Sequence, residues 1–517
     1  MEHQRGTRPA RCATALVLAL FIAVGVLWHC PLAYSEPLSI LWTQRLGGIS
    51  NDALTVVKAC SDGGCIVGGN TMSGVSGNKT SPINGGQDWW VVRLAANGAI
   101  MWDRTFGGAH NPSFPDVAAY DNLNAIVPAA DGGFLLVGGT TDSVGGTKTA
   151  SLHGTWDMYA VKINSQGDQI WDKTFGSSAI DGAAGACATT DGGFVLVGYT
   201  ERSGNRDVWV VKLDSAGAQV WEHSYGGTNM DQGIAIVQRP DGGYIVAANS
   251  ASKPSGDKTS PFFGGGGGFS DSSGDFWILW LDSQGVKTAE QSFGGTYDET
   301  VAALGLTPDA GLLIAGTSVS PASGNKTSPG LGWADGWFLR LDSTGTKLWD
   351  QSSGGPWWDS VASLKVLRDG GFLLGGTTNA NPVVARYHAG GVTVWHQTNG
   401  LAFRETVTSM DQAPNGDFFF AGTDWPGPGS FGGADLIVTK TSPEPPLLST
   451  SSTADTLLTK GFMLNALSAP GTCVPEWSTN LIQWFPLSTN VSDGLLYQVT
   501  DWDATNSPRR FYRVRRL

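Results

Sequence analysis

This 517-residue chain repeats one sequence motif, here called the phrase, and a carboxylate recurs at a fixed position in it. Each stands six positions after a slot, usually Phe or Tyr, that precedes a Gly-Gly pair or its variant. The set is Asp52, Asp181, Asp231, Glu299, Asp359 and Glu405, and in the second copy an insertion moves the residue to Asp116. Clustered carboxylates suit hard cations, so such a ring would accommodate Ca2+ or a basic ligand; no other cofactor is expected. Alternatively, each accepts backbone N–H bonds in its own loop or pairs with a nearby Lys, which repetition favours because active sites usually break symmetry.

Lysines and histidines in variable loops form the second group of candidates. The phrase Gly-Asn-Lys-Thr-Ser-Pro or its Asp variant recurs and supplies Lys79, Lys258 and Lys326. His110 and His153 are the best isolated histidines, although exposed loop histidines commonly have no special role. His-x-x-x-His and Gly-x-Ser-x-Gly contexts are absent, so the sequence predicts no catalytic residue.

Two cysteines flank a tight turn. Cys60 and Cys65 surround Ser61-Asp-Gly-Gly64, so they would face each other across a hairpin. A disulfide between them is reasonable in an oxidising compartment, and the sequence leaves open whether it forms.

The elements that position these residues are short strands. Asp-Gly or Asn-Gly turns start at Asp62, Asp131, Asp191, Asp241, Asp309, Asp369 and Asn415. Around each turn the phrase predicts four strands, A to D: A precedes the turn, B and C are apolar, and D usually begins with Trp. The copy at Asn415 lacks its D strand, which stands at the other end of the chain as Trp42-Thr-Gln-Arg-Leu-Gly-Gly48. A phrase split in this way predicts an all-β, seven-bladed β-propeller closed by an N-terminal strand.

Two columns of aromatic residues recur with the phrase. Strand D carries Trp42, Trp102, Trp171, Trp221, Trp349 and Trp395, and strand C carries Trp90, Tyr159, Trp209, Trp277 and Trp337. Regular spacing favours core between blades over a carbohydrate platform. The fourth copy has Ala289 in the strand D position, which predicts a thinner or differently filled seam.

Loop lengths distinguish the two faces of the ring. The A–B and C–D turns are short, whereas the B–C and D–A loops hold nearly all the variation in repeat length. Binding residues concentrate on loops held by a rigid scaffold, so the face with long loops is the functional candidate.

The repeat carries a family resemblance. Asp-Gly-Gly-Phe-x-Leu, Asp-x-Trp-x-Val-Lys-Leu and Trp-Asp-x-x-Phe-Gly-Gly resemble repeats of secreted bacterial β-propeller proteins over about residues 40–440. Their layout is also similar to quinoprotein-type propeller repeats. Further on, residues 477–484 and 510–514 resemble a small β-sandwich module common on exported bacterial proteins. That resemblance implies an accessory or surface-attachment role.

The chain ends and the composition suggest export. Arg5, Arg8 and Arg11 precede an apolar run, and Ala33-Tyr-Ser35 offers a cleavage site. We expect a signal peptide at 1–35, the propeller at 36–441, a Pro-rich linker at 442–446 and a β-sandwich-like domain at 447–517. The protein would be secreted, periplasmic or at the cell surface. A formal net charge of −13 argues against nucleic acid as a partner.

Three functions are compatible with these features. The first is a non-enzymatic, monomeric binding protein that engages an extracellular protein or glycan through the long loops, with the C-terminal module attaching it to the surface. The second is an enzyme that acts on polysaccharide with two carboxylates of the channel mouth. The third, implied by the quinoprotein-like layout, is a dehydrogenase, which ranks last because the adjacent Cys pair and metal ligands implied by that resemblance are missing.

Overall fold

The computed structural model describes residues 38–109, 121–264, 274–379, 381–398, 406–426 and 429–443, together with strands in the segments 18–21 and 447–516. It divides into two compact units. The larger comprises Ile40–Ala413 and Asp417–Thr441; the smaller comprises Met1–Ser39, Pro414–Gly416 and Ser442–Leu517.

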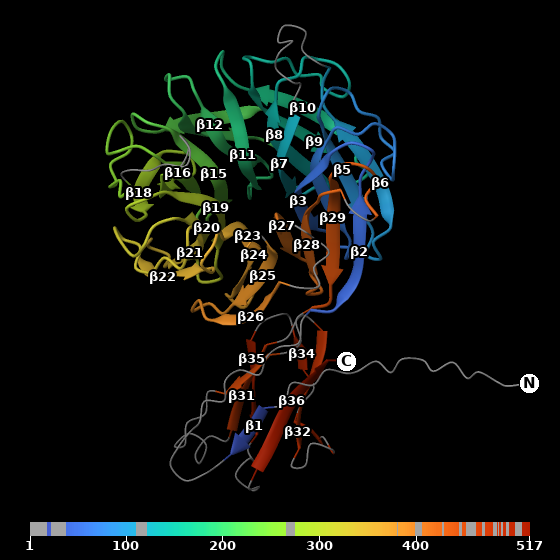
Figure 1. Cartoon of the computed structure of the whole chain (residues 1–517), viewed down its shortest axis with the longest axis vertical. Helices are drawn as coiled ribbons and strands as arrows, with labels where there is room; N and C mark the ends of the chain where they lie inside the picture. Colours follow the sequence, from blue (N-terminus) through green and yellow to red (C-terminus); the bar gives the residue numbers. More distant parts are fainter. Residues whose placement is uncertain are drawn as a thin grey trace, which may run out of the picture. The chain divides into compact units, whose positions relative to one another are not determined.

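The larger unit is a seven-bladed β-propeller in which every blade is a four-stranded antiparallel sheet. Figure 1 shows the blades following one another around the ring in chain order. Blade one is β3 (Asp52–Ala59), β4 (Cys65–Thr71), β5 (Asp88–Leu94) and β6 (Ile100–Phe106). Blade two is β7 (Asp121–Pro128), β8 (Phe134–Thr140), β9 (Asp157–Ile163) and β10 (Gln169–Phe175). Blade three is β11 (Asp181–Ala188), β12 (Phe194–Thr200), β13 (Asp207–Leu213) and β14 (Gln219–Tyr225).

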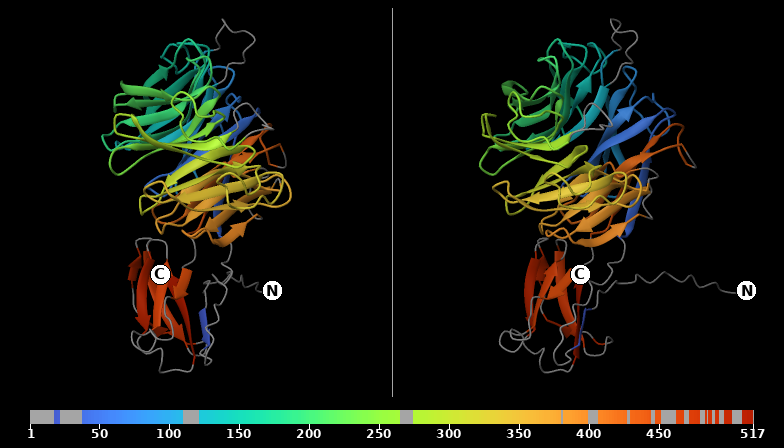
Figure 2. Two further views of the ribbon diagram at one scale, coloured as in Figure 1. Left: turned by 90° about the vertical axis from the view of Figure 1, so that its left-hand side faces the viewer. Right: turned by 60° about the vertical axis from the view of Figure 1, so that its left-hand side comes forward.

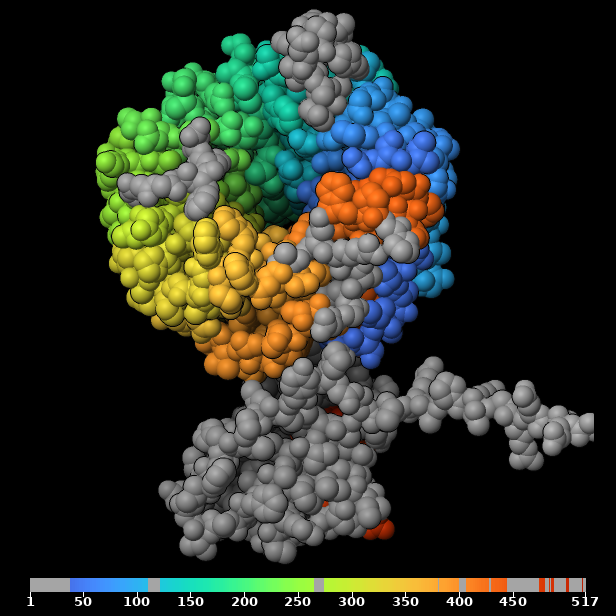
Figure 3. All heavy atoms as spheres, in the orientation of Figure 1, coloured from blue at the N-terminus to red at the C-terminus, as the bar shows by residue number. Residues whose placement is uncertain are grey.

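The next three blades repeat this pattern. Blade four is β15 (Asp231–Gln238), β16 (Tyr244–Ser250), β17 (Asp275–Leu281) and β18 (Lys287–Phe293). Blade five is β19 (Glu299–Leu306), β20 (Leu312–Ser318), β21 (Asp335–Leu341) and β22 (Lys347–Ser353). Blade six is β23 (Ser360–Val366), β24 (Phe372–Thr378), β25 (Asn381–Tyr387) and β26 (Thr393–Gln397). A space-filling view shows the blades side by side around a central hollow (Figure 3).

Blade seven joins the two ends of the propeller. It contains β27 (Ser409–Gln412), β28 (Phe418–Asp424) and β29 (Asp435–Thr441), and its outer strand is β2 (Ile40–Leu46). In the register of this pair, Ile40 lies opposite Thr441 and Leu46 opposite Leu436. Figure 2 shows blue β2 beside the orange strands of this blade. The predicted closure by the N-terminal strand is therefore confirmed.

Aromatic side chains fill the seams between neighbouring blades, as the spacing predicted. The strand C column (Trp90, Tyr159, Trp209, Trp277 and Trp337) is 0–1% exposed. The strand D Trp rings are half-buried, and several cover the C–D turn of the next blade. An added Cβ on Gly98 would meet the ring of Trp42 at 2.9 Å, and one on Gly167 would meet Trp102 at 2.9 Å. These turns need glycine both for the positive φ and for the ring above it.

Blade four fills its seam by a different side chain. Ala289 stands in the strand D Trp position, opposite Trp280 of strand C. In other blades the residue in Trp280's position is a Lys or Arg that pairs with the A–B turn, as Arg93 does with Asp62 at 2.6 Å. Here the Trp280 ring covers Gly345, at 2.9 Å from an added Cβ. The expected differently filled seam thus arises from two coupled changes within one strand pair.

The smaller unit is also built of strands. One sheet contains β1 (Leu18–Phe21), β36 (Arg509–Arg516), β32 (Gly471–Ser478), β33 (Phe485–Pro486) and β34 (Asn490–Ser492). A three-stranded sheet contains β30 (Leu447–Thr450), β31 (Phe462–Leu467) and β35 (Leu496–Asp501). Among the described residues, no helix is long and apolar enough to cross a membrane.

Candidate functional site between blades five and six

The recurrent carboxylates are buried supports of the D–A loops. Asp52, Asp181, Asp231 and Glu299 are fully buried, and Asp359 is 1% exposed. Each accepts a hydrogen bond from the backbone N–H four residues earlier, as in Gly48 N to Asp52 at 2.7 Å and Gly295 N to Glu299 at 2.9 Å. The alternative, in which each carboxylate accepts a backbone N–H bond in its own loop, is therefore confirmed for these residues, and their oxygens do not form an open ring at the channel mouth. Asp116 and Glu405 lie outside the described residues; Asp121, as the first residue of β7, holds the equivalent position in blade two.

A second set of carboxylates faces the first, and the sequence analysis missed it. It stands at the first residue of strand C and comprises Asp88, Asp157, Asp207, Asp275, Asp335 and Asp435. Burial raises the pKa of Asp88 to about 6 and that of Asp275 to about 7. Glu299 of the next blade adds a like charge that raises the pKa of Asp275 further. The signal was the Asp that opens each Asp-x-Trp phrase.

The loop lysines hold their own loops rather than face a ligand. Lys79, Lys258 and Lys326 are 1–2% exposed, and burial lowers the pKa of each. The Lys326 ammonium donates to the Ser328 carbonyl at 2.7 Å and to Ser352 Oγ at 3.0 Å. The sequence predicted that these lysines contact a ligand. Their burial in their own loops disagrees with that prediction.

The remaining sequence candidates are dispersed. His153 is exposed on the B–C loop of blade two, and His110 lies outside the described residues. Cys60 and Cys65 are unbridged. The register places Ala59, not Cys60, opposite Cys65. Because Cys65 packs into the seam with blade seven and Cys60 packs towards blade two, their side chains lie on opposite faces of the blade.

The seam between blades five and six contains a cavity of about 270 Å³. Three positions that carry bulky side chains in most other blades carry small ones here. Gly336 stands where blade one has Trp89, Ser353 where it has Phe106, and Val383 where blade two has Tyr159. All three line the cavity. The pocket therefore results from the absence of the side chains that fill the other seams.

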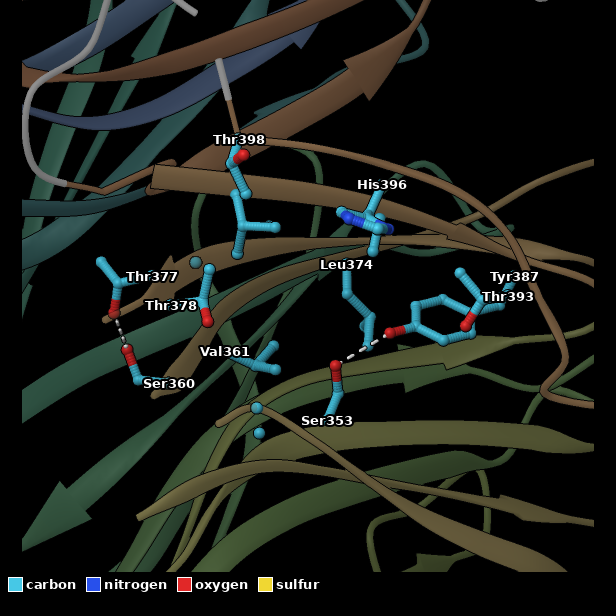
Figure 4. A pocket seen from close by; sticks show the side chains of 16 residues that line it. Ser353, Ser360, Val361, Leu374, Thr377, Thr378, Tyr387, Thr393, His396 and Thr398 are labelled. Carbon is cyan, nitrogen blue, oxygen red and sulfur yellow. Dashed lines mark hydrogen bonds between the residues drawn. The ribbon is translucent and has the colours of Figure 1, made fainter. Parts of the chain in front are cut away.

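Hydroxyl groups and one imidazole line this pocket (Figure 4). The Tyr387 hydroxyl donates to Ser353 Oγ at 3.1 Å, and the hydroxyls of Ser360 and Thr377 lie 3.0 Å apart. His396 lies on the outer strand β26 and is exposed. Neutral polar groups beside apolar walls can orient an uncharged polar ligand.

Exposed Trp side chains lie on two adjoining loops next to the pocket. Trp333 is 71% exposed, Trp357 64% and Trp358 48%. The loops are joined by a bridge between Ala334 and Trp358, and Asp359 N donates to the Ala334 carbonyl at 2.9 Å. Gly354, which lines the pocket, precedes Trp357 by three residues. We call Trp333, Trp357 and Trp358 the tryptophan surface.

A second hollow lies on the inner strands of blades two to four. Its volume is about 360 Å³, and its lining includes Asn122, Asn124, Trp156, Tyr199 and Gln232. Asn124 is already engaged, since its amide donates to the Ala183 carbonyl at 2.7 Å. This hollow has amide groups and half-buried aromatic rings, and its lining includes none of the three residues of the tryptophan surface.

Comparisons with known proteins give only distant likenesses. Neither a protein-family model nor a curated protein sequence matches the chain. The crystal structure of Sqt1 from Chaetomium thermophilum is similar with a TM-score of 0.41 at 11% identity, over 93% of this chain and 99% of that one. The periplasmic gluconolactonase PpgL of Pseudomonas aeruginosa gives 0.39 at 13% identity, over 84% and 99%. A Lactobacillus plantarum protein gives 0.41 at 11% identity, also over 84% and 99%. Likenesses of this size do not bear on function.

Proposed function

We propose that this protein is an exported, non-enzymatic β-propeller that binds an extracellular glycan at the tryptophan surface and the adjoining pocket. The observation that carries the proposal is the exposure of Trp333, Trp357 and Trp358 on neighbouring loops. Exposed apolar clusters of this kind mark interaction sites. An indole ring offers a flat apolar face to the C–H face of a sugar, and pocket hydroxyls can exchange hydrogen bonds with sugar hydroxyls.

The irregularity of the tryptophan surface supports a binding role. Other exposed apolar residues recur on the outer strands at equivalent places, such as Met101, Ile170 and Val220, and belong to the repeat itself. Tyr297 and Ile180 stand at the positions of Trp357 and Trp358 in other blades and are also exposed, but a group of three indole rings on adjoining loops does not recur among the described residues. Features that a scaffold does not need in every blade are the better candidates for function.

An enzyme that acts on polysaccharide is the weaker candidate. Hydrolysis of a glycosidic bond by the usual route needs two carboxyl groups about 5–9 Å apart beside the bond. The described lining of the pocket contains no Asp or Glu, and His396 is its one imidazole. A quinone-dependent dehydrogenase has no support from this lining.

Export and surface attachment complete the proposal. Cleavage after Ser35 would remove β1 from the sheet of the smaller unit and release a mature chain that begins at Glu36, and the remaining strands of that unit would then attach or display the propeller. N-terminal sequencing of protein recovered from the cell exterior tests the first step. A chain that keeps residues 1–35 in its native location would contradict it.

Calorimetric titration of the mature protein with soluble polysaccharides of different backbone tests the binding site. We expect one class of polysaccharide to bind and Trp333→Ala and Trp357→Ala to weaken binding at least tenfold with the melting temperature unchanged. Trp425→Ala is the matched control, because Trp425 is 50% exposed on the B–C loop of blade seven. Loss of binding in Gln232→Ala alone would place the ligand on the inner strands and contradict the proposed site.

Two further results would contradict the function itself. Release of reducing ends from a bound polysaccharide would make the protein an enzyme. Absence of binding to every polysaccharide, together with binding of an extracellular protein that Trp333→Ala abolishes, would make the ligand a protein.

A further inference from the structure

Three buried carboxylates meet at the junction of blades one and two. Asp88 begins β5, Asp121 begins β7, and Asp142 lies two residues after the end of β8. One oxygen from each lies within 4.8 Å of the others, and all three side chains are fully buried. The cluster is separate from the pocket between blades five and six.

Asp142 makes this junction different from its equivalents. In blades one, four and five the residue at this position is Ser73, Ser252 or Ser320. Ser73 Oγ donates to Asp52 at 2.9 Å, and Ser252 Oγ donates to Asp231 at 2.8 Å. An ionised Asp142 cannot donate, so blade two replaces a donor with a third acceptor.

Two oxygens of the cluster, Asp88 Oδ1 and Asp121 Oδ1, accept no hydrogen bond from the described residues. Asp88 Oδ2 accepts from Asn84 N at 2.5 Å, whereas the fully buried Asp88 Oδ1 has no donor among the described residues. A buried carboxylate oxygen without a partner costs free energy unless something else compensates for it.

The chain passes close to Asp88 Oδ1 at Gly85, where no side chain would fit. An added Cβ on Gly85 would lie 2.8 Å from the Gly108 carbonyl oxygen, 2.9 Å from Asp142 Oδ2 and 3.4 Å from Asp88 Oδ1. Three oxygens therefore lie close together beside Gly85, and one of them is a backbone carbonyl. This mixture of carboxylate and carbonyl ligands is typical of calcium sites.

Among the described residues, no cation pairs directly with Asp88 or Asp121. Within the described part of the chain, Asp88 and Asp121 have no Lys or Arg nitrogen within ion-pair distance. Lys148 attracts Asp121, but its ammonium donates to the Ala150 carbonyl and lies 5.5 Å from the centre of the Tyr159 ring. Burial and the neighbouring carboxylates raise the pKa of Asp121 well above its usual range.

We propose that Asp88, Asp121 and Asp142 bind one Ca2+ ion, with the Gly108 carbonyl as a fourth ligand. Ca2+ takes six to eight oxygens in flexible geometry, so water would supply the rest. Because Asp88 opens the third strand of blade one and Asp121 opens the inner strand of blade two, the ion would tie the two blades together. This site is independent of the glycan site proposed above.

Equilibrium dialysis of the EDTA-treated mature protein against CaCl2 tests this proposal. We expect one Ca2+ per chain and a rise in melting temperature as Ca2+ saturates. Asp142→Ser restores the serine of the other blades, so it should fold and should weaken Ca2+ binding at least a hundredfold. Asp88→Asn should weaken binding at least tenfold, whereas Asp231→Asn, a buried carboxylate of another junction, should leave stoichiometry and affinity unchanged.

Three results would overturn the proposal. No Ca2+ bound at millimolar concentration would mean that protons, not a cation, neutralise the cluster. Equal Ca2+ binding by the wild type and Asp142→Ser would place the ion elsewhere. Equal affinity for Mg2+ and Ca2+ would contradict the assignment to Ca2+, because Mg2+ requires a compact octahedral set of ligands.

Discussion

The seam between blades one and two and the seam between blades five and six have the same strands in the same register but opposite contents. In the first, Trp89, Phe106 and Tyr159 pack together, and the rings of Trp89 and Tyr159 lie 4.9 Å apart. In the second, Gly336, Ser353 and Val383 leave a cavity of about 270 Å³. The hydrogen-bonded sheets of the blades therefore form even where the side chains that usually fill the seam between them are missing. A binding site can arise in such a repeat by omission, without any new element.

The largest effect should come from emptying the filled seam. Trp89→Ala removes a fully buried indole and should lower the free energy of unfolding by about 3–5 kcal/mol. The matched change Val383→Ala should cost only about 1 kcal/mol, because this side chain already borders a cavity. Urea denaturation of the two variants makes the comparison. Equal losses would show that the two seams contribute alike.

Two other seams, between blades four and five and between blades six and seven, differ in charge. Blade six opens strand C with Asn381, whereas Asp275 opens it in blade four with its pKa raised from 3.8 to about 7. The raised pKa favours the protonated form in the folded state. Its contribution to stability is fully present below about pH 4 and is lost as the pH rises through 7.

Asp275→Asn should flatten this dependence. We expect the fall in the free energy of unfolding between pH 4 and pH 7 to shrink by on the order of 2 kcal/mol. Denaturant titrations at a series of pH values measure it, with Asp342→Asn, a change on an exposed C–D turn, as the control. The same slope in the wild type and in Asp275→Asn would show that the carboxyl is not perturbed as described.

The smallest effect on stability should come from filling the empty seam. Val383→Tyr supplies the ring that Tyr159 provides in blade two and should stabilise the protein by about 1 kcal/mol. It should also weaken glycan binding at least tenfold, since the ring would occupy the pocket. Unchanged binding in a stabilised variant would exclude the pocket from the ligand site and leave the tryptophan surface alone.

The ring could be predicted from the sequence because its signals are local and repeated. The split phrase required β2 to pair with β29, and the regular Trp and Tyr positions required a packed seam. The pocket left a weaker signal, since Ser353 replaces the Phe or Tyr that usually precedes Gly-Gly and Val383 interrupts the aromatic column of strand C. An interruption shows that a side chain is missing, but only the packing shows whether neighbours close the gap.

The other differences between the sequence-based predictions and the structure concern residues whose neighbours are set by the fold and not by the local sequence. Counting positions led to Asp116, because an insertion hides where β7 begins; the strand itself identifies Asp121. The Asp residues that open strand C, Asp88 among them, could be seen in the repeat. Only the closed ring shows that they approach the carboxylates that open strand A of the next blade. Cys60 and Cys65 looked paired because a turn separates them, whereas the register turns their side chains to opposite faces.

The pairing of β2 with β29 also determines how the propeller responds to mechanical load. Ile40 and Thr441, where the chain enters and leaves the ring, lie opposite each other at the same end of an antiparallel pair. Tension applied through them pulls along the direction of the hydrogen bonds between the strands, so the bonds bear the load one after another rather than together. The same closure that removes both free edges of the ring is thus the place where force would open it, by peeling β2 away while six blades remain intact.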